Sequence, residues 1–245
     1  MFTFGHVRIR YACLVFLLTL SSLAEEPQKK GASRPPHPSF AAVTDVAGLP
    51  RVLLIGDSIS MGYTLPVRRL LSGQANVHRP AENCGDTARG VENLDRWLGS
   101  GKWYVIHFNF GLHDLKFLDA TGKYVAPDQG KQVASPEQYA ANLRAITRRL
   151  QATGARLVFA TTTPVPAGSL GRVQGEEQRY NEAALRVMRE LHVEIDDLHA
   201  VVDRGPSGLQ LPKNVHFSDE GYERLAQNVA ACVRPLLPAA TKSRR

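Results

Sequence analysis

A serine and a histidine follow predicted strands, and a second histidine, His216, stands just before the last predicted helix. Ser58 follows the apolar run 52–55, and His113 follows a second apolar run, 103–110. A serine hydroxyl near a helix N-terminus is favoured as a nucleophile because developing negative charge is stabilised there. It needs a base such as His113 or His216 to take its proton. The alternatives are that Ser58 only caps a helix and that the histidines are structural.

Strand-like and helix-like segments alternate from residue 51 to residue 233. Short apolar or β-branched runs predict five strands, at 52–55, 75–78, 103–110, 156–161 and 193–195. Amphipathic segments predict helices at 65–71, 90–98, 136–152 with Ser135 as N-cap, 176–191 and 218–233. This alternation predicts a three-layer α/β/α sandwich with a five-stranded parallel sheet covered on both faces.

The predicted sheet determines where these side chains can meet. In such sheets the ligand site lies beyond the carboxyl ends of the strands. Ser58 and His113 both fall at that edge. His216 reaches Ser58 only if the end of the chain folds back over the first strand. Two glycine-containing connections, 116–134 and 164–175, are expected to form the rim of a pocket there.

Four segments in this order resemble the sequence blocks of the GDSL/SGNH hydrolase superfamily, from residue 51 to about residue 233. They are Gly56-Asp57-Ser58, Asn83-Cys84-Gly85, Gly111-Leu112-His113-Asp114 and the segment ending in His216. The resemblance implies a flavodoxin-like fold, Ser58 as nucleophile and His216 as base. It also implies an oxyanion hole made by the backbone N–H groups of Ser58 and Gly85 together with the His113 side chain.

The third block departs from the family pattern at one residue. His113 stands where the family has asparagine. A neutral imidazole can still donate one N–H to an oxyanion, provided that a neighbour fixes its tautomer.

The last block departs at the residue that should orient the base. Lys213 stands three residues before His216, where the family has aspartate. Either a carbonyl, from the backbone or from Asn214, orients His216 in a Ser-His dyad, or another carboxylate does so. Asp197 and Asp219 are candidates for the second arrangement. A missing carboxylate weakens the base without abolishing oxyanion stabilisation.

The resemblance implies an enzyme that hydrolyses carboxylic esters through an acyl-enzyme. O-acetyl groups on a carbohydrate are the expected substrate class, by analogy with the family. Lipid and thioester substrates stay open, and a glycan-binding member that has lost catalysis is the alternative from another class. No metal or organic cofactor is implied. The sequence lacks a G-x-S-x-G elbow and an H-E-x-x-H zinc motif, and residues 99–102 do not complete a P-loop.

The N-terminus has the pattern of an export signal. Arg8 and Arg10 precede an apolar run at 11–20, and small residues end at Ala24. The run is shorter than the ~20 residues that span a bilayer, which disfavours the alternative of a membrane anchor. We therefore expect a signal peptide at 1–24, a flexible leader at 25–48, a hydrolase domain at 49–236 and a basic tail at 237–245. The mature protein is expected to be periplasmic or secreted, without stable membrane insertion.

Charge and cysteines add little to the functional assignment. The formal net charge of +7 is modest, and no basic helix is interleaved with aromatic residues, so nucleic-acid binding is not expected. Two cysteines, Cys84 and Cys232, remain after the signal. Export would permit a disulfide between them, but two free thiols are equally compatible with the sequence. The sequence does not indicate an oligomeric state.

Overall fold

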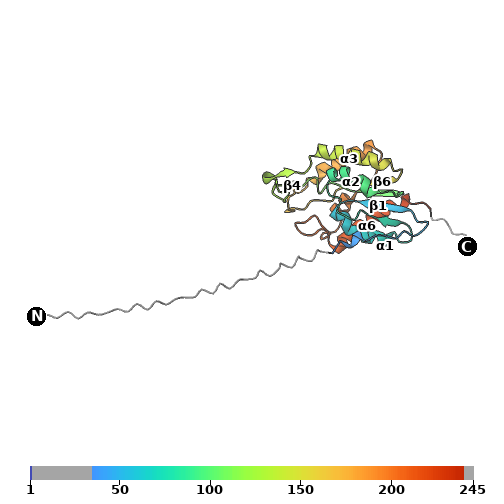
Figure 1. Ribbon diagram of the computed structural model, residues 1–245, viewed down its shortest axis with the longest axis horizontal. Coiled ribbons are helices and arrows are strands. Elements are labelled where there is room, and N and C mark those ends of the chain that lie inside the picture. Colours follow the sequence, from blue (N-terminus) through green and yellow to red (C-terminus); the bar gives the residue numbers. More distant parts are fainter. Residues whose placement is uncertain (2–34, 240–245) are drawn as a thin grey trace. The chain divides into compact units, whose positions relative to one another are not determined.

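Five short apolar runs form a single parallel sheet in the computed structural model, which describes residues 35–239 and Met1 (Figure 1). The strand order is β2-β1-β3-β6-β7, and each neighbouring pair is parallel. The strands are β1 (Arg51–Ile55), β2 (Asn76–His78), β3 (Val105–Phe108), β6 (Arg156–Ala160) and β7 (Glu194–Asp196). The five-stranded parallel sheet predicted from the sequence is confirmed.

Helices cover both faces of this sheet. In Figure 1, α2 and α3 lie above the strands, and α1 and α6 lie below them. The pairs α1–α6, α2–α3 and α3–α4 are each in contact, so the layers are continuous. The helices are α1 (Ser58–Leu70), α2 (Thr87–Leu98), α3 (Pro136–Gln151), α4 (Glu177–Glu190), α5 (Leu198–Asp203) and α6 (Asp219–Val233). This is the predicted three-layer α/β/α sandwich.

The two central strands end at the same level, and this brings their following loops together. Leu53 and Ile55 of β1 are almost completely buried, as a strand between two helical layers requires. Ile55 pairs in register with Phe108 of β3, and the Asn109 N–H donates to the Ile55 carbonyl at 3.0 Å. The segments that begin at Gly56 and at Asn109 therefore leave the sheet side by side.

Helix α1 begins seven residues before the predicted start at residue 65. Its N-cap is Asp57, whose Oδ1 accepts the Ile59 N–H at 2.9 Å. Gly62 and Pro66 lie inside the helix and weaken its sequence signal. Gly62 has a packing reason, since a Cβ there would lie 2.1 Å from Cε1 of Tyr222 in α6. The close approach of two helices thus overrides local helix propensity.

Several small elements were not predicted, among them two short strands, a 3-10 helix and a short α-helix. Within residues 116–134, β4 (Phe117–Leu118) pairs antiparallel with β5 (Lys131–Gln132), and Pro127–Gln129 forms the 3-10 helix η2. Helix α5 follows β7 directly and is capped by Asp197. Two-residue strands and a six-residue helix are too short to produce a hydrophobic period.

The described part of the predicted leader contacts the domain. Residues 38–40 form the 3-10 helix η1, in which Ser39 is fully buried. Asp45 forms ion pairs with Arg51 and His78, and the Asn76 side chain bonds the backbone of Val46. The compact unit accordingly begins at Pro36, not at residue 49. The proline- and serine-rich composition of residues 25–48 suggested a flexible leader, but these residue types are also common in ordered caps and turns.

The predicted signal peptide at 1–24 lies outside the described residues, apart from Met1. Helix α6 is followed by the 3-10 helix η3 (Arg234–Leu236), and the described chain ends at residue 239, inside the predicted basic tail. None of the helices in the described residues combines the length and apolarity needed to cross a membrane.

Candidate active site

Ser58 and His216 meet at the carboxyl end of β1. Ser58 is the first residue of α1, and its Oγ lies 2.8 Å from Nε2 of His216. His216 is placed there because α6 packs along α1, which returns the chain end to the edge of the first strand. The helix cap is Asp57, so the Ser58 hydroxyl is not consumed by capping. Its geometry is that of a nucleophile and its base.

Asn214 orients the imidazole of His216. Its Oδ1 lies 2.8 Å from Nδ1 of His216 and also accepts the His216 backbone N–H at 3.1 Å. Because a backbone N–H can only donate, this second bond identifies the amide atom as the oxygen. The oxygen can only accept, so Nδ1 carries the proton and Nε2 presents its lone pair to Ser58. The predicted orienting residue is thus in place, with an amide instead of a carboxylate.

The two other candidates for this role lie elsewhere. Asp197 caps α5 and accepts a hydrogen bond from Thr161 Oγ1 at 3.0 Å, and Asp219 is exposed in the first turn of α6. Lys213, at the position of the family aspartate, has a left-handed backbone with φ of 55° and lines the site cavity. The position of the family aspartate is thus occupied by a lysine in a left-handed turn, and Asn214 supplies the acceptor to His216.

The charge state of His216 suits a base. Burial lowers the pKa of His216 below 6.5, an effect that nearby Asp57 opposes and Arg172 reinforces. The imidazole is therefore neutral near pH 7 and able to accept a proton. Asp57 is fully buried, and its Oδ2 makes no hydrogen bond within the described part of the chain.

His113 lies in the same cavity, and Lys116 determines its tautomer. Lys116 Nζ lies 3.2 Å from Nδ1 of His113. An ammonium group can only donate, so Nδ1 accepts and Nε2 carries the proton. Burial lowers the pKa of His113, and Lys116 and Arg172 lower it further against the opposing effect of Asp57. His113 is therefore a neutral imidazole with one N–H that it can donate.

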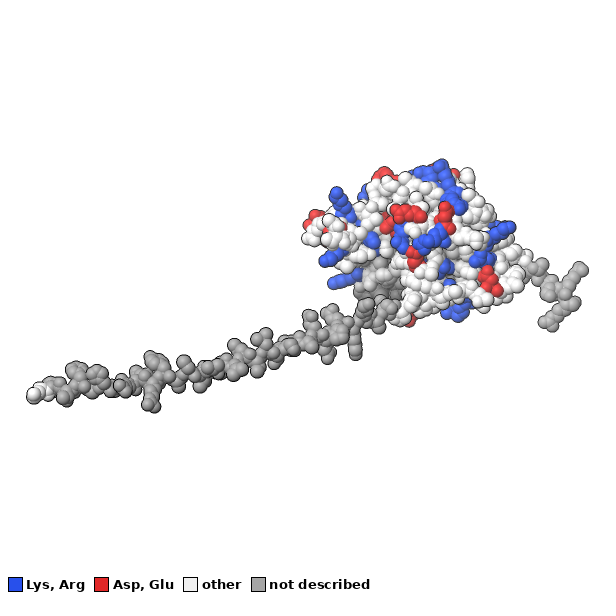
Figure 2. Space-filling view, in the orientation of Figure 1, with Lys and Arg blue, Asp and Glu red and all other residues white. Residues whose placement is uncertain are grey.

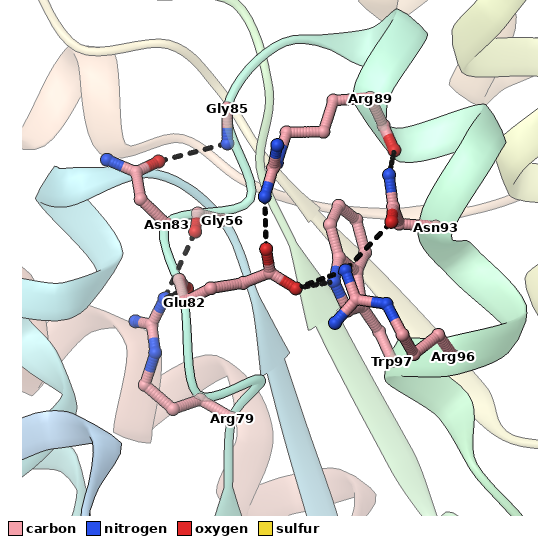
Figure 3. A network of polar contacts seen from close by, with 9 residues as sticks. All are labelled: Gly56, Arg79, Glu82, Asn83, Gly85, Arg89, Asn93, Arg96 and Trp97. Atoms are coloured by element: carbon pink, nitrogen blue, oxygen red, sulfur yellow. Dashed lines mark hydrogen bonds and ion pairs between the residues drawn. The ribbon is translucent and has the colours of Figure 1, made fainter.

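Gly85 lies in the loop between β2 and α2. Its φ of 70° is a conformation that glycine adopts without strain. Its N–H donates to Asn83 Oδ1 at 2.9 Å, so an oxyanion would compete with this amide for the same donor (Figure 3). Asn83 itself lines the cavity, although from the sequence it was expected only to mark the second block.

A half-buried arginine connects this loop to the end of β1. Arg79 donates to the Gly56 carbonyl at 3.2 Å and to the Glu82 carbonyl at 3.0 Å (Figure 3). The Glu82 carboxylate in turn accepts from Trp97 Nε1 of α2 at 2.7 Å. Sequence reasoning missed Arg79, because a single arginine after a strand carries no pattern.

Asp114 ties the His113 turn to the start of α2. Its carboxylate accepts the Thr87 N–H at 3.0 Å and also bonds the Thr87 hydroxyl. Burial raises the pKa of Asp114 to about 7, against the lowering effect of these bonds. Arg79 and Asp114 thus hold three separate loops around one cavity.

The cavity has a volume of about 470 Å³. Its walls come from both predicted rim connections as well as from the site loops. It is lined by Ser58, Asn83, His113, Tyr124, Ser169, Leu170, Arg172, Lys213, Asn214, Val215 and His216. In the part of the chain that the structure describes, no group of three or more His, Cys, Asp or Glu side chains is placed to hold a metal ion. Cys84 and Cys232 are both free thiols.

Comparison with known proteins identifies the family. The model of the GDSL-like lipase/acylhydrolase family matches residues 54–224, which include all the site loops described above. The chain therefore belongs to the GDSL-like lipase/acylhydrolase family, whose members are esterases and other hydrolases. None of the curated protein sequences matches the chain.

Solved structures share the fold. A lipase/acylhydrolase from Enterococcus faecalis superposes with a TM-score of 0.64 at 17% identity, covering 79% of this chain and 100% of that one. An acetylxylan esterase from Geobacillus stearothermophilus, solved as a catalytic mutant, gives a TM-score of 0.61 at 15% identity, with coverages of 74% and 93%. A further acetyl xylan esterase gives a TM-score of 0.60 at 15% identity, with coverages of 75% and 99%.

Proposed function

We propose that this protein is an exported serine esterase that removes small acyl groups, with O-acetyl groups on carbohydrate as its substrate class. The observation that carries the proposal is the Ser58 Oγ–His216 Nε2 contact of 2.8 Å, with His216 Nδ1 held by Asn214. The carbohydrate substrate is supported by analogy, since two of the fold neighbours are acetyl xylan esterases. Export is supported by the charged and apolar pattern of residues 1–24.

The proposed reaction is acyl transfer in two halves. His216 takes the Ser58 proton as Oγ attacks the ester carbonyl carbon. The resulting oxyanion accepts hydrogen bonds from the Ser58 backbone N–H, from His113 Nε2–H and from the Gly85 N–H, which exchanges Asn83 Oδ1 for the oxyanion. The carbon–oxygen bond to the alcohol then breaks, and His216 returns its proton to the leaving oxygen. Water, deprotonated by His216, attacks the acyl-enzyme, releasing the carboxylic acid and regenerating Ser58.

The neutral state of both histidines fits these roles. His216 must be unprotonated to act as base, and its lowered pKa provides this at neutral pH. His113 must keep a proton on Nε2, which Lys116 secures by donating to Nδ1. With an amide at 214, the imidazolium formed in the transition state receives less stabilisation than a carboxylate would give.

A fluorophosphonate probe tests the nucleophile. The probe should label the wild-type protein covalently, and Ser58→Ala should abolish both labelling and hydrolysis of 4-nitrophenyl acetate. The expected loss of kcat is on the order of 10⁴–10⁶. Ser169→Ala is the matched control, because Ser169 also lines the cavity but bonds the Pro166 carbonyl. Retained turnover in a folded Ser58→Ala protein would contradict the proposal.

N-terminal sequencing tests export. A chain recovered from outside the cytoplasm should begin at or near Glu25, since the apolar run ends in small residues at Ala24. A mature chain that begins at Met1 would contradict export by signal cleavage.

A further inference from the structure

We infer that the substrate's alcohol portion carries an anionic group, a carboxylate or a sulfate, that binds Arg172 and Lys213 at the His216 side of the cavity. The inference rests on the proposed esterase function and specifies its substrate class. It depends on two observations: cationic side chains lie at the cavity, and within the described residues they have no carboxylate partner.

Two cationic side chains line the cavity, and a third lies directly behind its wall. Arg172 and Lys213 are lining residues, and Lys116 lies against His113 and Tyr124, which also line it. Within residues 35–239, no carboxylate lies within 4.0 Å of the charged groups of these three residues. In contrast, many surface arginines, such as Arg69 and Arg144, are paired with glutamates. Figure 2 shows several Lys and Arg side chains at the end of the domain that carries β4, with others spread over the rest of the visible face.

Arg172 is held in a fixed position with donors to spare. Its Nε donates to the Leu112 carbonyl at 3.0 Å and its Nη1 to the Leu170 carbonyl at 3.2 Å. The guanidinium also lies 5.4 Å from the ring centroid of Tyr124. Nη2 has no hydrogen-bond partner in the described part of the chain. A planar, anchored guanidinium with unused donors suits the recognition of carboxylate or sulfate oxygens.

The reaction geometry assigns Lys213 to the alcohol side of the ester, and Arg172 lines the same cavity near enough to both histidines to lower the pKa of each. His216 must return its proton to the leaving oxygen, so the alcohol lies on the His216 side of the cavity. Lys213 is three residues before His216 on the same loop and is exposed at the cavity. Its stem packs near Gly168, where a Cβ would lie 3.1 Å from Lys213 Cγ. The anionic group takes no part in bond making, and it positions the alcohol beside His216.

The test compares two chromogenic acetates that differ in one charge. One is 4-nitrophenyl acetate, and the other is 3-carboxy-4-nitrophenyl acetate, whose leaving alcohol carries a carboxylate. Lys213→Glu should lower the ratio of kcat/KM for the anionic ester to kcat/KM for the neutral ester about ten-fold. Comparing variants by this ratio cancels the difference in intrinsic reactivity. A 3-sulfo ester distinguishes sulfate-like from carboxylate recognition, and a preference for either supports the inference.

Matched variants separate local charge from net charge and from folding. Lys102→Glu makes the same charge change near the amino end of β3, away from the site, and should leave the ratio unchanged. Arg172→Gln should lower the ratio, and Arg172→Lys should restore part of it by keeping the charge. Raising the ionic strength from about 0.01 M to about 1 M should erase the preference, because the Debye length falls from about 30 Å to about 3 Å.

Two outcomes would overturn the inference. The first is a ratio that does not change in Lys213→Glu and Arg172→Gln while both esters are hydrolysed, which leaves the esterase function intact. If neither ester is hydrolysed, the esterase function fails instead. Calorimetry on Ser58→Ala protein then tests anion binding independently of turnover. If the inferred site exists, 3-carboxy-4-nitrophenol should bind more tightly than 4-nitrophenol. Equal affinity for these two phenols is the second overturning outcome.

Discussion

Changing Asn214 to aspartate should strengthen the base. The Asn214 carbonyl accepts from His216 Nδ1–H at 2.8 Å, and an aspartate of nearly the same shape would place a carboxylate oxygen there. A hydrogen bond to a charged group contributes about 1.5–3 kcal/mol, against about 0.5–1.5 kcal/mol for a neutral one. The difference of about 1 kcal/mol applies only when the imidazole is charged. We expect kcat/KM at its pH plateau to rise about five-fold.

The same substitution should move the acidic limb of the pH profile. In the wild type, burial lowers the pKa of His216, so the midpoint of the acidic limb should lie below pH 6.5. A carboxylate at 214 favours the protonated imidazole and therefore raises the pKa of His216. The acidic limb should move to higher pH while the plateau rises. The assay is kcat/KM for 4-nitrophenyl acetate between about pH 4.5 and pH 8.

Asn214→Leu is the matched control, because it keeps the volume but removes the acceptor. His216 then loses the partner that fixes its tautomer, and kcat should fall by a factor of about 10² or more. Wild-type activity with an unchanged pH profile in Asn214→Leu would show that Asn214 does not orient His216. Loss of activity in Asn214→Asp with an unmoved acidic limb would also contradict this role, since the carboxylate would then not face Nδ1.

The two histidines should respond differently to the same substitution. In steady-state kinetics, His113→Asn should retain much of kcat, because asparagine still supplies an N–H donor. His216→Asn leaves no base and should lose nearly all of kcat. The reverse pattern would mean that the roles of the two histidines are exchanged. Lys116→Met should lower kcat about two- to five-fold with little change in KM, because the His113 imidazole then populates both tautomers. The same change in a His113→Asn background should have no effect on kcat, and an equal loss in both backgrounds would indicate that Lys116 acts only structurally.

Strand and helix order was predictable because it depends on local pattern. The run 52–55 is apolar throughout, as a strand between two helical layers must be, and residues 218–233 repeat with a helical period. The start of α1 was not predictable in this way. Its glycine and proline act against helix propensity, and contact with Tyr222 of α6 compensates for the glycine.

The sequence by itself determined which residues are candidates, and the tertiary structure decided how they are connected. Block order and strand ends pointed to Ser58, His113 and His216, since side chains at the carboxyl edge of a parallel sheet share one site. The choice of Asn214 over Asp197 or Asp219 required the fold, because hydrogen bonding depends on distances of about 3 Å between groups that no sequence spacing specifies. The His113 tautomer likewise depends on one contact with Lys116, made by a turn whose geometry is set by packing around it.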